Sequence, residues 1–374
     1  MTNKGLHIAL FFWGLVFTSC VQRIDFEVPP AADQIVIEGS ISSDLEPCTV
    51  KISRGLNINT DSIVNQPVTN AKVVLFDDLG NAEGFTETIQ GTYQTNREIQ
   101  GEIGRSYHIE VELPNGNLFV SEPDTLRATG QINNIRYEYE ARTVERYSET
   151  VAADVFNIYI DAKTSGQGES YVRWRFKGTY KAETNPELRT IVTPSYPVPL
   201  KSPLPCSGYI VVSFVPGGKL EMVDECTCCV CWVNHFEVSP QLSETQFVEA
   251  GKFNNIKVAE VPINVATFHD KYLVDVEQMS LSKNAYEFFS LVKDQKENAA
   301  SLFQPPAGEI RGNIRAVNNN SQVIGLFYAA SISKKSIFLQ KSDVPYPLTA
   351  ITFVTDECTN YYPDSFSEKP EEWD

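Results

Sequence analysis

The chain has 374 residues, of which 42% are hydrophobic, and its formal net charge is −17. This length is enough for about two domains with buried cores. The acidic balance argues against binding to nucleic acid and against direct adhesion to an anionic membrane, because both carry negative charge. Beyond the first 20 residues no segment approaches 18 uninterrupted apolar residues, so no membrane-spanning helix is predicted.

The first 20 residues predict a lipoprotein signal peptide. Lys4 supplies a positive start, and residues 6–17 are almost wholly apolar, which is too short a run to span a bilayer as a helix of roughly 20 residues. Small residues then lead into Cys20. We expect residues 1–19 to be removed and Cys20 to carry acyl chains, of which two or more give a stable anchor. The alternative is an ordinary signal peptide whose cleavage region happens to contain Cys20.

Residues 20–33 predict a lipid-anchored tether, because they contain proline and show no hydrophobic periodicity. Fully extended, this tether would reach roughly 40 Å at about 3.3 Å per residue.

An immunoglobulin-like β-sandwich is predicted over residues 34–128. Short segments with alternating apolar and polar residues are separated by turn signals, such as the hairpin turn at 114–117. The predicted strands are 35–41, 49–53, 71–76, 106–113 and 118–121.

A larger β-rich, disulfide-containing domain is predicted over residues 131–360. Residues 171–180 alternate apolar or aromatic with mostly basic side chains, which is typical of a half-buried strand, and 194–205 reads as a proline-rich loop. One main helix is predicted at about 280–298, where apolar residues recur at helical spacing and Ser280 or Ser282 can cap the first turn. The acidic tail, residues 361–374, is expected to be mobile.

Eight cysteines are present, and apart from the lipidation candidate they divide into one isolated residue and six others. Cys48 stands alone and is expected to be a buried or half-buried free thiol. Six cysteines in an oxidising compartment predict up to three disulfides, with 15 possible connectivities. These disulfide candidates are Cys206, Cys226, Cys228, Cys229, Cys231 and Cys358.

The dense cysteine cluster has two alternative interpretations, a soft-metal site or a redox motif. The spacing suits a structural zinc site poorly, and the context of a thioredoxin-like motif is missing. The vicinal Cys228 and Cys229 are not expected to pair with each other. Cys358 should fix the C-terminal part of the chain by closing a long loop from Cys231 or a neighbour, which contributes on the order of 4 kcal/mol in the chain-entropy model.

No catalytic residues, cofactor or metal are predicted. The sequence contains no GxSxG elbow, HExxH motif or phosphate-binding loop. A hydrolase would need His235 or His269 beside carboxylates in a deep pocket; His108 reads as a surface or edge residue. An exposed aromatic platform for a sugar or peptide is an alternative to a structural role for four residues, Tyr171, Trp174, Tyr180 and Trp232.

An ordered set of short segments is similar to a Bacteroidota family of outer-membrane lipoproteins known only as a domain of unknown function. The segments are 35–39, 91–93, 171–174, 281–289, 301–306, 311–314 and 323–331. The resemblance covers the mature chain and implies that Gly312 and Gly325 occupy turns or close approaches. It also implies a place beside TonB-dependent receptors, the outer-membrane barrels that import large nutrients. No catalytic residues are established for the family, so none carry over.

We therefore expect a lipid-anchored outer-membrane protein that serves as an accessory or binding subunit of a TonB-dependent transporter. Asp25 and Glu27 follow Cys20 closely, a pattern that accompanies export to the cell surface in the Bacteroidota. The expected partners are a TonB-dependent receptor or another outer-membrane β-barrel protein, and the membrane through the lipid. One alternative is a structural subunit of a barrel-based envelope assembly or secretion complex, and another is a surface hydrolase.

Overall fold

The computed structural model describes residues 34–55, 66–146, 149–166, 171–193, 196–213, 218–244, 251–298, 312–318, 321–348 and 353–373. The predicted signal peptide, Cys20 and the tether lie outside these ranges. The fold is mainly β, as predicted, and α2 (Lys283–Asn298) is the one long helix in the described part of the chain. No helix in this part is long and apolar enough to cross a membrane.

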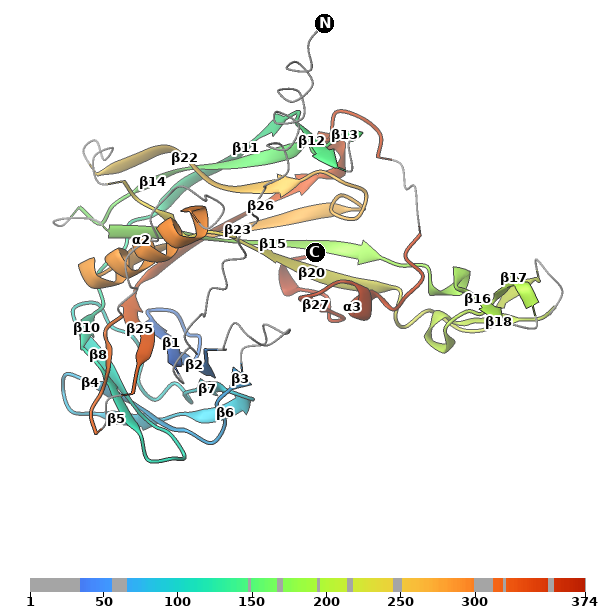
Figure 1. The fold of residues 1–374 in the computed structure, drawn as a ribbon. Coiled ribbons are helices and arrows are strands. Elements are labelled where there is room, and N and C mark those ends of the chain that lie inside the picture. The colour runs from blue at the N-terminus through green and yellow to red at the C-terminus, as the bar shows by residue number, and fades with distance from the viewer. Residues whose placement is uncertain are drawn as a thin grey trace, which may run out of the picture.

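Sandwich 1, the N-terminal body, consists of two six-stranded sheets (Figure 1). In β8 (Ser106–Glu112) every second side chain is buried, so Tyr107, Ile109 and Val111 face the core, as the alternation predicted. One sheet contains, in order, β25 (Val323–Ala330), β1 (Ile35–Ser42), β2 (Thr49–Arg54), β7 (Thr92–Gln94) and β6 (Thr86–Ile89), with β3 (Gln66–Pro67) beside β2. The other contains β24 (Ile314–Ala316), β9 (Leu118–Ser121), β8, β4 (Lys72–Asp77) and β5 (Ala82–Gly84), with β10 (Asp124–Thr125) beside β8.

Two strands from the far end of the sequence complete sandwich 1. β25 pairs in parallel with β1, and β24 pairs with β9. The glycines make this possible, because a Cβ atom at Gly325 would lie 1.8 Å from the carbonyl oxygen of Ile37. A Cβ atom at Gly312 would lie 1.3 Å from the carbonyl oxygen of Gly325. β24 and β25 therefore belong to sandwich 1, although their residues lie within the range 131–360 that was predicted for the second domain.

Sandwich 2 packs a three-stranded sheet against a six-stranded one. The small sheet has the order β11 (Ile132–Glu140), β14 (Val155–Lys163) and β22 (Lys252–Pro262). The large sheet has the order β26 (Ile332–Gln340), β23 (Lys271–Leu281), β15 (Tyr171–Glu183), β20 (Val230–Phe236) and β27 (Ser365–Phe366), with β21 (Gln241–Leu242) beside β15. Trp174 and Phe156 are buried between the two sheets, so Trp174 is a core residue and not part of an exposed platform.

The two sandwiches meet at a hydrogen-bonded junction. The hydroxyl groups of Ser280 and Ser331 both donate to the carbonyl oxygen of Arg127, at 2.5 and 2.8 Å. The backbone N–H of Ser331 donates to the Ser280 hydroxyl oxygen at 3.1 Å. Helix α2 lies between the sandwiches with Ala285 buried, and the Ser282 hydroxyl caps it by accepting from the Ala285 N–H, as predicted.

The C-terminal segment is anchored, which corrects the expectation of a mobile acidic tail. β27 pairs with β20, and Trp373 is buried against Trp232 and Phe338. Lys271 donates from its Nζ to the carbonyl oxygen of Trp373 at 2.5 Å. The prediction considered only the acidic residues of this segment. Its apolar side chains hold it on the outer face of the large sheet.

Candidate functional site

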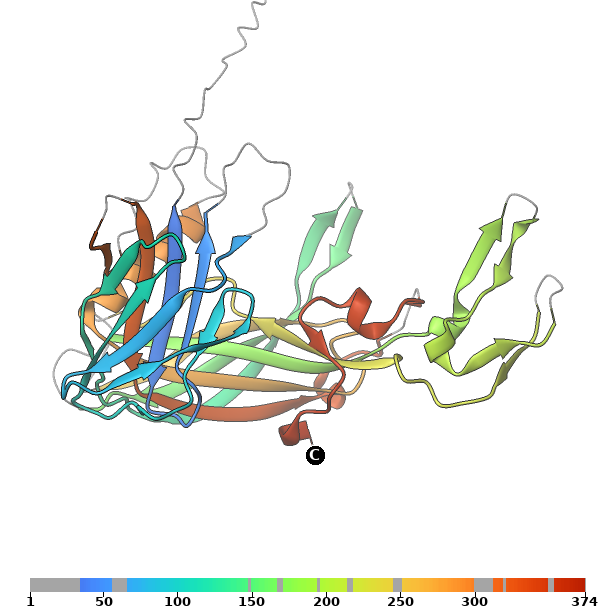
Figure 2. The same ribbon diagram turned by 90° about the horizontal axis from the view of Figure 1, so that it is seen from below.

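The described residues of the range 186–229, which we call the arm, project from sandwich 2 between β15 and β20 (Figures 1 and 2). The arm contains two hairpins, and the predicted proline-rich loop is partly a strand of the first one. The first hairpin is β16 (Thr190–Thr193) with β17 (Tyr196–Lys201), and the second is β18 (Tyr209–Val211) with β19 (Leu220–Met222). Proline is compatible with β17 because a two-stranded hairpin has only outer strands, where a missing N–H breaks no ladder.

All six predicted cysteines form disulfides: Cys206–Cys228, Cys226–Cys229 and Cys231–Cys358. The vicinal pair is not joined, as expected, and Cys358 is bonded to Cys231 across a separation of 127 residues. The bond between Cys206 and Cys228 joins the parts of the arm that flank its second hairpin, and the bond between Cys226 and Cys229 closes a short loop after that hairpin. These thiols are therefore not available as metal ligands in this structure, and no other metal-binding group of His, Cys, Asp or Glu occurs in the described part of the chain.

Cys48 is the buried free thiol that the sequence predicted. Its Sγ atom donates to the carbonyl oxygen of Ser40 at 3.2 Å. Burial, and next the negative charge of Glu83, raise the pKa of this thiol far above its ordinary value. Cys48 is therefore a structural residue and not a reactive one.

The arm exposes many aliphatic side chains. Eight of its large hydrophobic residues are between 40 and 65% exposed. These are Leu188, Ile191, Val192, Val198, Ile210, Val212, Met222 and Val223. An isolated two-stranded hairpin buries neither face and is marginal in water, and contiguous exposed apolar surface marks interaction sites. The arm carries only three basic and four acidic residues, so it is also nearly neutral in a strongly acidic chain.

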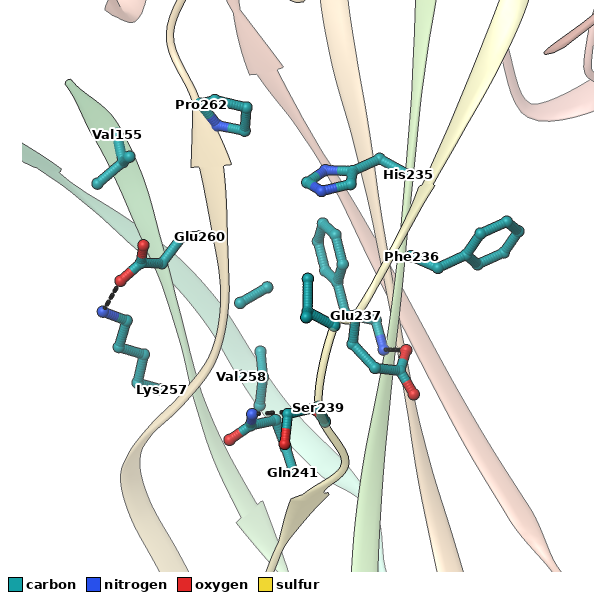
Figure 3. Close-up of a pocket in the computed structure, with 13 residues that line it drawn as sticks. Val155, His235, Phe236, Glu237, Ser239, Gln241, Lys257, Val258, Glu260 and Pro262 are labelled. Atoms are coloured by element: carbon teal, nitrogen blue, oxygen red, sulfur yellow. Dashed lines mark hydrogen bonds and ion pairs between the residues drawn. The ribbon is translucent and has the colours of Figure 1, made fainter. Parts of the chain in front are cut away.

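A cavity of about 560 Å³ lies along one edge of sandwich 2 (Figure 3). We call this edge, with its cavity, the seam. β22 is the outer strand of the small sheet, and β20 leaves β15 after Phe236 before the chain rejoins β15 at β21. The cavity lies between β22 and this departing segment. Its floor includes Phe176 and Val258, which are fully buried, and Val238 is exposed at its mouth. The side chain of Phe236 points away from β22 (Figure 3).

His235 lies at the seam and forms a hydrogen bond with the side chain of Tyr272. Its Nδ1 atom is 3.0 Å from the hydroxyl oxygen of Tyr272. Burial lowers the pKa of His235, so the imidazole is neutral near pH 7. Gly178 pairs with His235 across the strands, and its missing side chain leaves the space that the Tyr272 hydroxyl group occupies.

The two carboxylates at the seam already form ion pairs and hydrogen bonds within the protein. Glu237 accepts from Arg173 Nη2 at 2.8 Å and from the backbone N–H of Phe176 at 3.1 Å. Glu260 accepts from two nitrogens of Arg142, at 2.7 and 2.9 Å, and from Lys257. Arg142 and Lys257 therefore lower the pKa of Glu260.

The other expected residues do not converge on this cavity. The Nε2 atom of His269 lies 3.3 Å from Glu183 at a partly exposed site. His108 stacks on Phe76 in sandwich 1. Tyr180 stacks on Tyr272, and Tyr171 contacts Tyr286. In the described part of the chain, neither His235 nor His269 shares a pocket with a free carboxylate pair of the kind that a hydrolase needs.

The sequence alone identified the cysteines but not the arm or the seam. The exposed aliphatic residues of the arm lie in and around a segment that was predicted to be a loop. Their spacing follows neither a helical nor a strand period, so the sequence did not indicate which of them are exposed. One feature of the sequence could have indicated the arm: this proline-bearing segment before the cysteine cluster contains many aliphatic residues.

A family described as a domain of unknown function (DUF4249) has a model that matches residues 21–336. No curated protein and no solved structure matches the chain. The match covers nearly all of sandwiches 1 and 2 and confirms the resemblance to a family of unknown function. The chain belongs to the DUF4249 family.

Proposed function

We propose that the protein is an outer-membrane lipoprotein of the Bacteroidota that serves as an accessory, partner-binding subunit of a TonB-dependent transporter. The cysteine at the end of the predicted signal peptide supports the lipid anchor. The family resemblance supports the barrel partner and a position at the cell surface. The absence of a recognised catalytic motif from the sequence supports a binding role over a hydrolytic one.

The arm is the observation that carries this proposal. It projects away from both sandwiches, and the disulfide between Cys206 and Cys228 closes the base of its second hairpin. Eight large hydrophobic side chains are exposed on it. A preorganised element loses little conformational freedom on binding, which favours affinity. Its near neutrality also avoids the repulsion that the rest of this acidic chain would exert on another acidic protein.

Affinity purification of the tagged protein from outer membranes of its native bacterium, in mild detergent, tests this proposal. The test variant carries Val192→Asp and Met222→Asp, one charge on each hairpin. The control carries Leu79→Asp in an exposed turn of sandwich 1, where the side chain is 72% exposed. We expect a barrel protein to accompany the wild type and the control and to be lost from the arm variant, because charges disrupt an apolar interface.

Recovery of the wild type without any barrel protein would contradict the proposal. Recovery of a barrel that belongs to an assembly or secretion machine would favour the alternative structural role. Deletion of the gene separates the two roles: loss of a transporter subunit impairs use of a nutrient, whereas loss of an assembly subunit harms the envelope even in rich medium.

A further inference from the structure

We propose that the seam of sandwich 2 is a binding site for an extended peptide segment of a partner protein, which adds as a strand to the outer edge of β22. The site is separate from the arm, and the inference does not depend on the proposed transporter role.

The free edge of β22 is the first argument. In the described part of the chain β22 pairs with β14 alone, over most of its 11 residues. An outer strand presents a row of backbone N–H and C=O groups that another strand can pair with. In Figure 3 β22 has β14 on one side and the cavity with His235 and Glu237 on the other.

The cavity beside this edge is the second argument. Because β20 departs from β15 after Phe236, the two sheets do not close on each other here. The resulting space of about 560 Å³ has Phe176 and Val258 at its base. At its mouth Val238 is 79% exposed. In strand addition, main-chain hydrogen bonds hold the peptide and pockets beside the edge take alternate side chains.

The charges at the seam decide the class of ligand. Glu237 is paired with Arg173, and Glu260 with Arg142 and Lys257. His235 is neutral near pH 7 and already bonded to Tyr272. A charged ligand would have to displace one of these pairs. Besides the β22 backbone, the seam offers the uncharged polar side chains of Ser239 and Gln241. The complementary ligand is therefore an uncharged, extended polypeptide with alternate apolar side chains.

The ionic residues at this edge also explain why copies of the protein need not pair with one another. Charged side chains on an outer strand oppose indiscriminate strand pairing. Lys257 and Glu260 are charged side chains of this kind, and they flank the stretch of β22 that borders the cavity. A partner segment without charges at the matching positions meets no such opposition.

Selection of peptides from a random library tests the inference. A phage-displayed library of dodecapeptides is panned on the full mature chain, in which Cys20→Ser prevents acylation. We expect enriched peptides that alternate apolar residues and compete with one another for one site. Synthetic copies should bind the variant Val238→Asp about tenfold more weakly, whereas Leu79→Asp in the exposed turn of sandwich 1 should leave binding unchanged. The parent chain and both variants are compared for their thermal unfolding, so that a folding defect is recognised.

Two readouts distinguish strand addition from simple apolar binding. Bound peptide should slow hydrogen exchange of amides in residues 256–262. Methylation of alternate peptide nitrogens, which removes donors but keeps the side chains, should weaken binding about tenfold. Failure to enrich any peptide, or enriched peptides that bind the seam variant as tightly as the wild type, would overturn the inference. Equal binding of the methylated peptide would show that the cavity takes apolar groups without strand pairing and would also overturn it.

Discussion

The hydroxyl group of Tyr272 occupies the position that a side chain at residue 178 would need: a Cβ atom on Gly178 would lie 1.8 Å from that oxygen. The same hydroxyl group lies 3.0 Å from Nδ1 of His235. One glycine in the middle of a strand thus allows a buried phenol to reach an imidazole across the sheet, although glycine weakens a strand interior elsewhere.

Gly178→Ala should destabilise the protein by about 1–3 kcal/mol, because the added methyl group overpacks the core at Tyr272. Chemical denaturation measures the free energy of unfolding. Gly84→Ala is the matched control, since nothing lies within 4 Å of a Cβ atom there, and its effect should stay within about 0.5 kcal/mol. Equal effects at the two positions would contradict this packing.

The stability of the protein should depend on pH through His235. Its pKa in the folded state is lowered from 6.5 by burial, so the unfolded chain takes up a proton first as the pH falls. Stability is therefore lost as the pH falls from about 6.5 toward the folded pKa, and no effect of this group remains above about 6.5. Denaturation of the wild type and of His235→Asn at pH 7.5 and pH 5 should show a smaller loss in the variant. An identical pH dependence would exclude this role for His235.

The three disulfides should differ in their contributions. The bond from Cys231 to Cys358 spans 127 residues and contributes about 5 kcal/mol in the chain-entropy model, whereas the bond from Cys226 to Cys229 spans three and contributes roughly 2 kcal/mol. Replacing each pair by alanine and measuring denaturation should give losses in that order. The reverse order would contradict the entropic account.

Alkylation followed by mass spectrometry should find one free thiol, Cys48, in the unreduced mature chain that carries Cys20→Ser. Cys48 should resist labelling in the native protein, because its thiol is buried and its pKa is raised, and should label after denaturation. Free labelling of the six cysteines near the arm would contradict the disulfide assignment.

Local patterns in the sequence predicted the elements that depend on local physics. The alternation in 106–113 predicted a strand, and the spacing around Ala285 predicted α2 with a cap at Ser280 or Ser282, of which the structure shows Ser282. The parallel pairing of Ile35 with Val323 could not be predicted in the same way, because it joins distant segments through tertiary contacts. The burial of Trp373 was missed for a similar reason, since its partners Trp232 and Phe338 belong to other strands.

The candidate sites were less predictable than the fold. The even number of cysteines predicted disulfides, but the projection of the arm depends on where β15 and β20 end. The seam forms because β20 separates from β15 after Phe236, and the spacing of hydrophobic residues in the sequence does not predict this separation. Sites formed by gaps between sheets are visible only once both sheets are placed.

Site-specific photo-cross-linking in living cells tests the central claim, that the arm contacts an outer-membrane barrel protein, most directly. A photo-reactive amino acid is placed at Val192 on the arm and, as a matched exposed position, at Leu79 in sandwich 1. The account predicts a cross-link from residue 192 to a TonB-dependent barrel and none from residue 79. Cross-links from residue 192 to no protein, or the same barrel adducts from both positions, would contradict it.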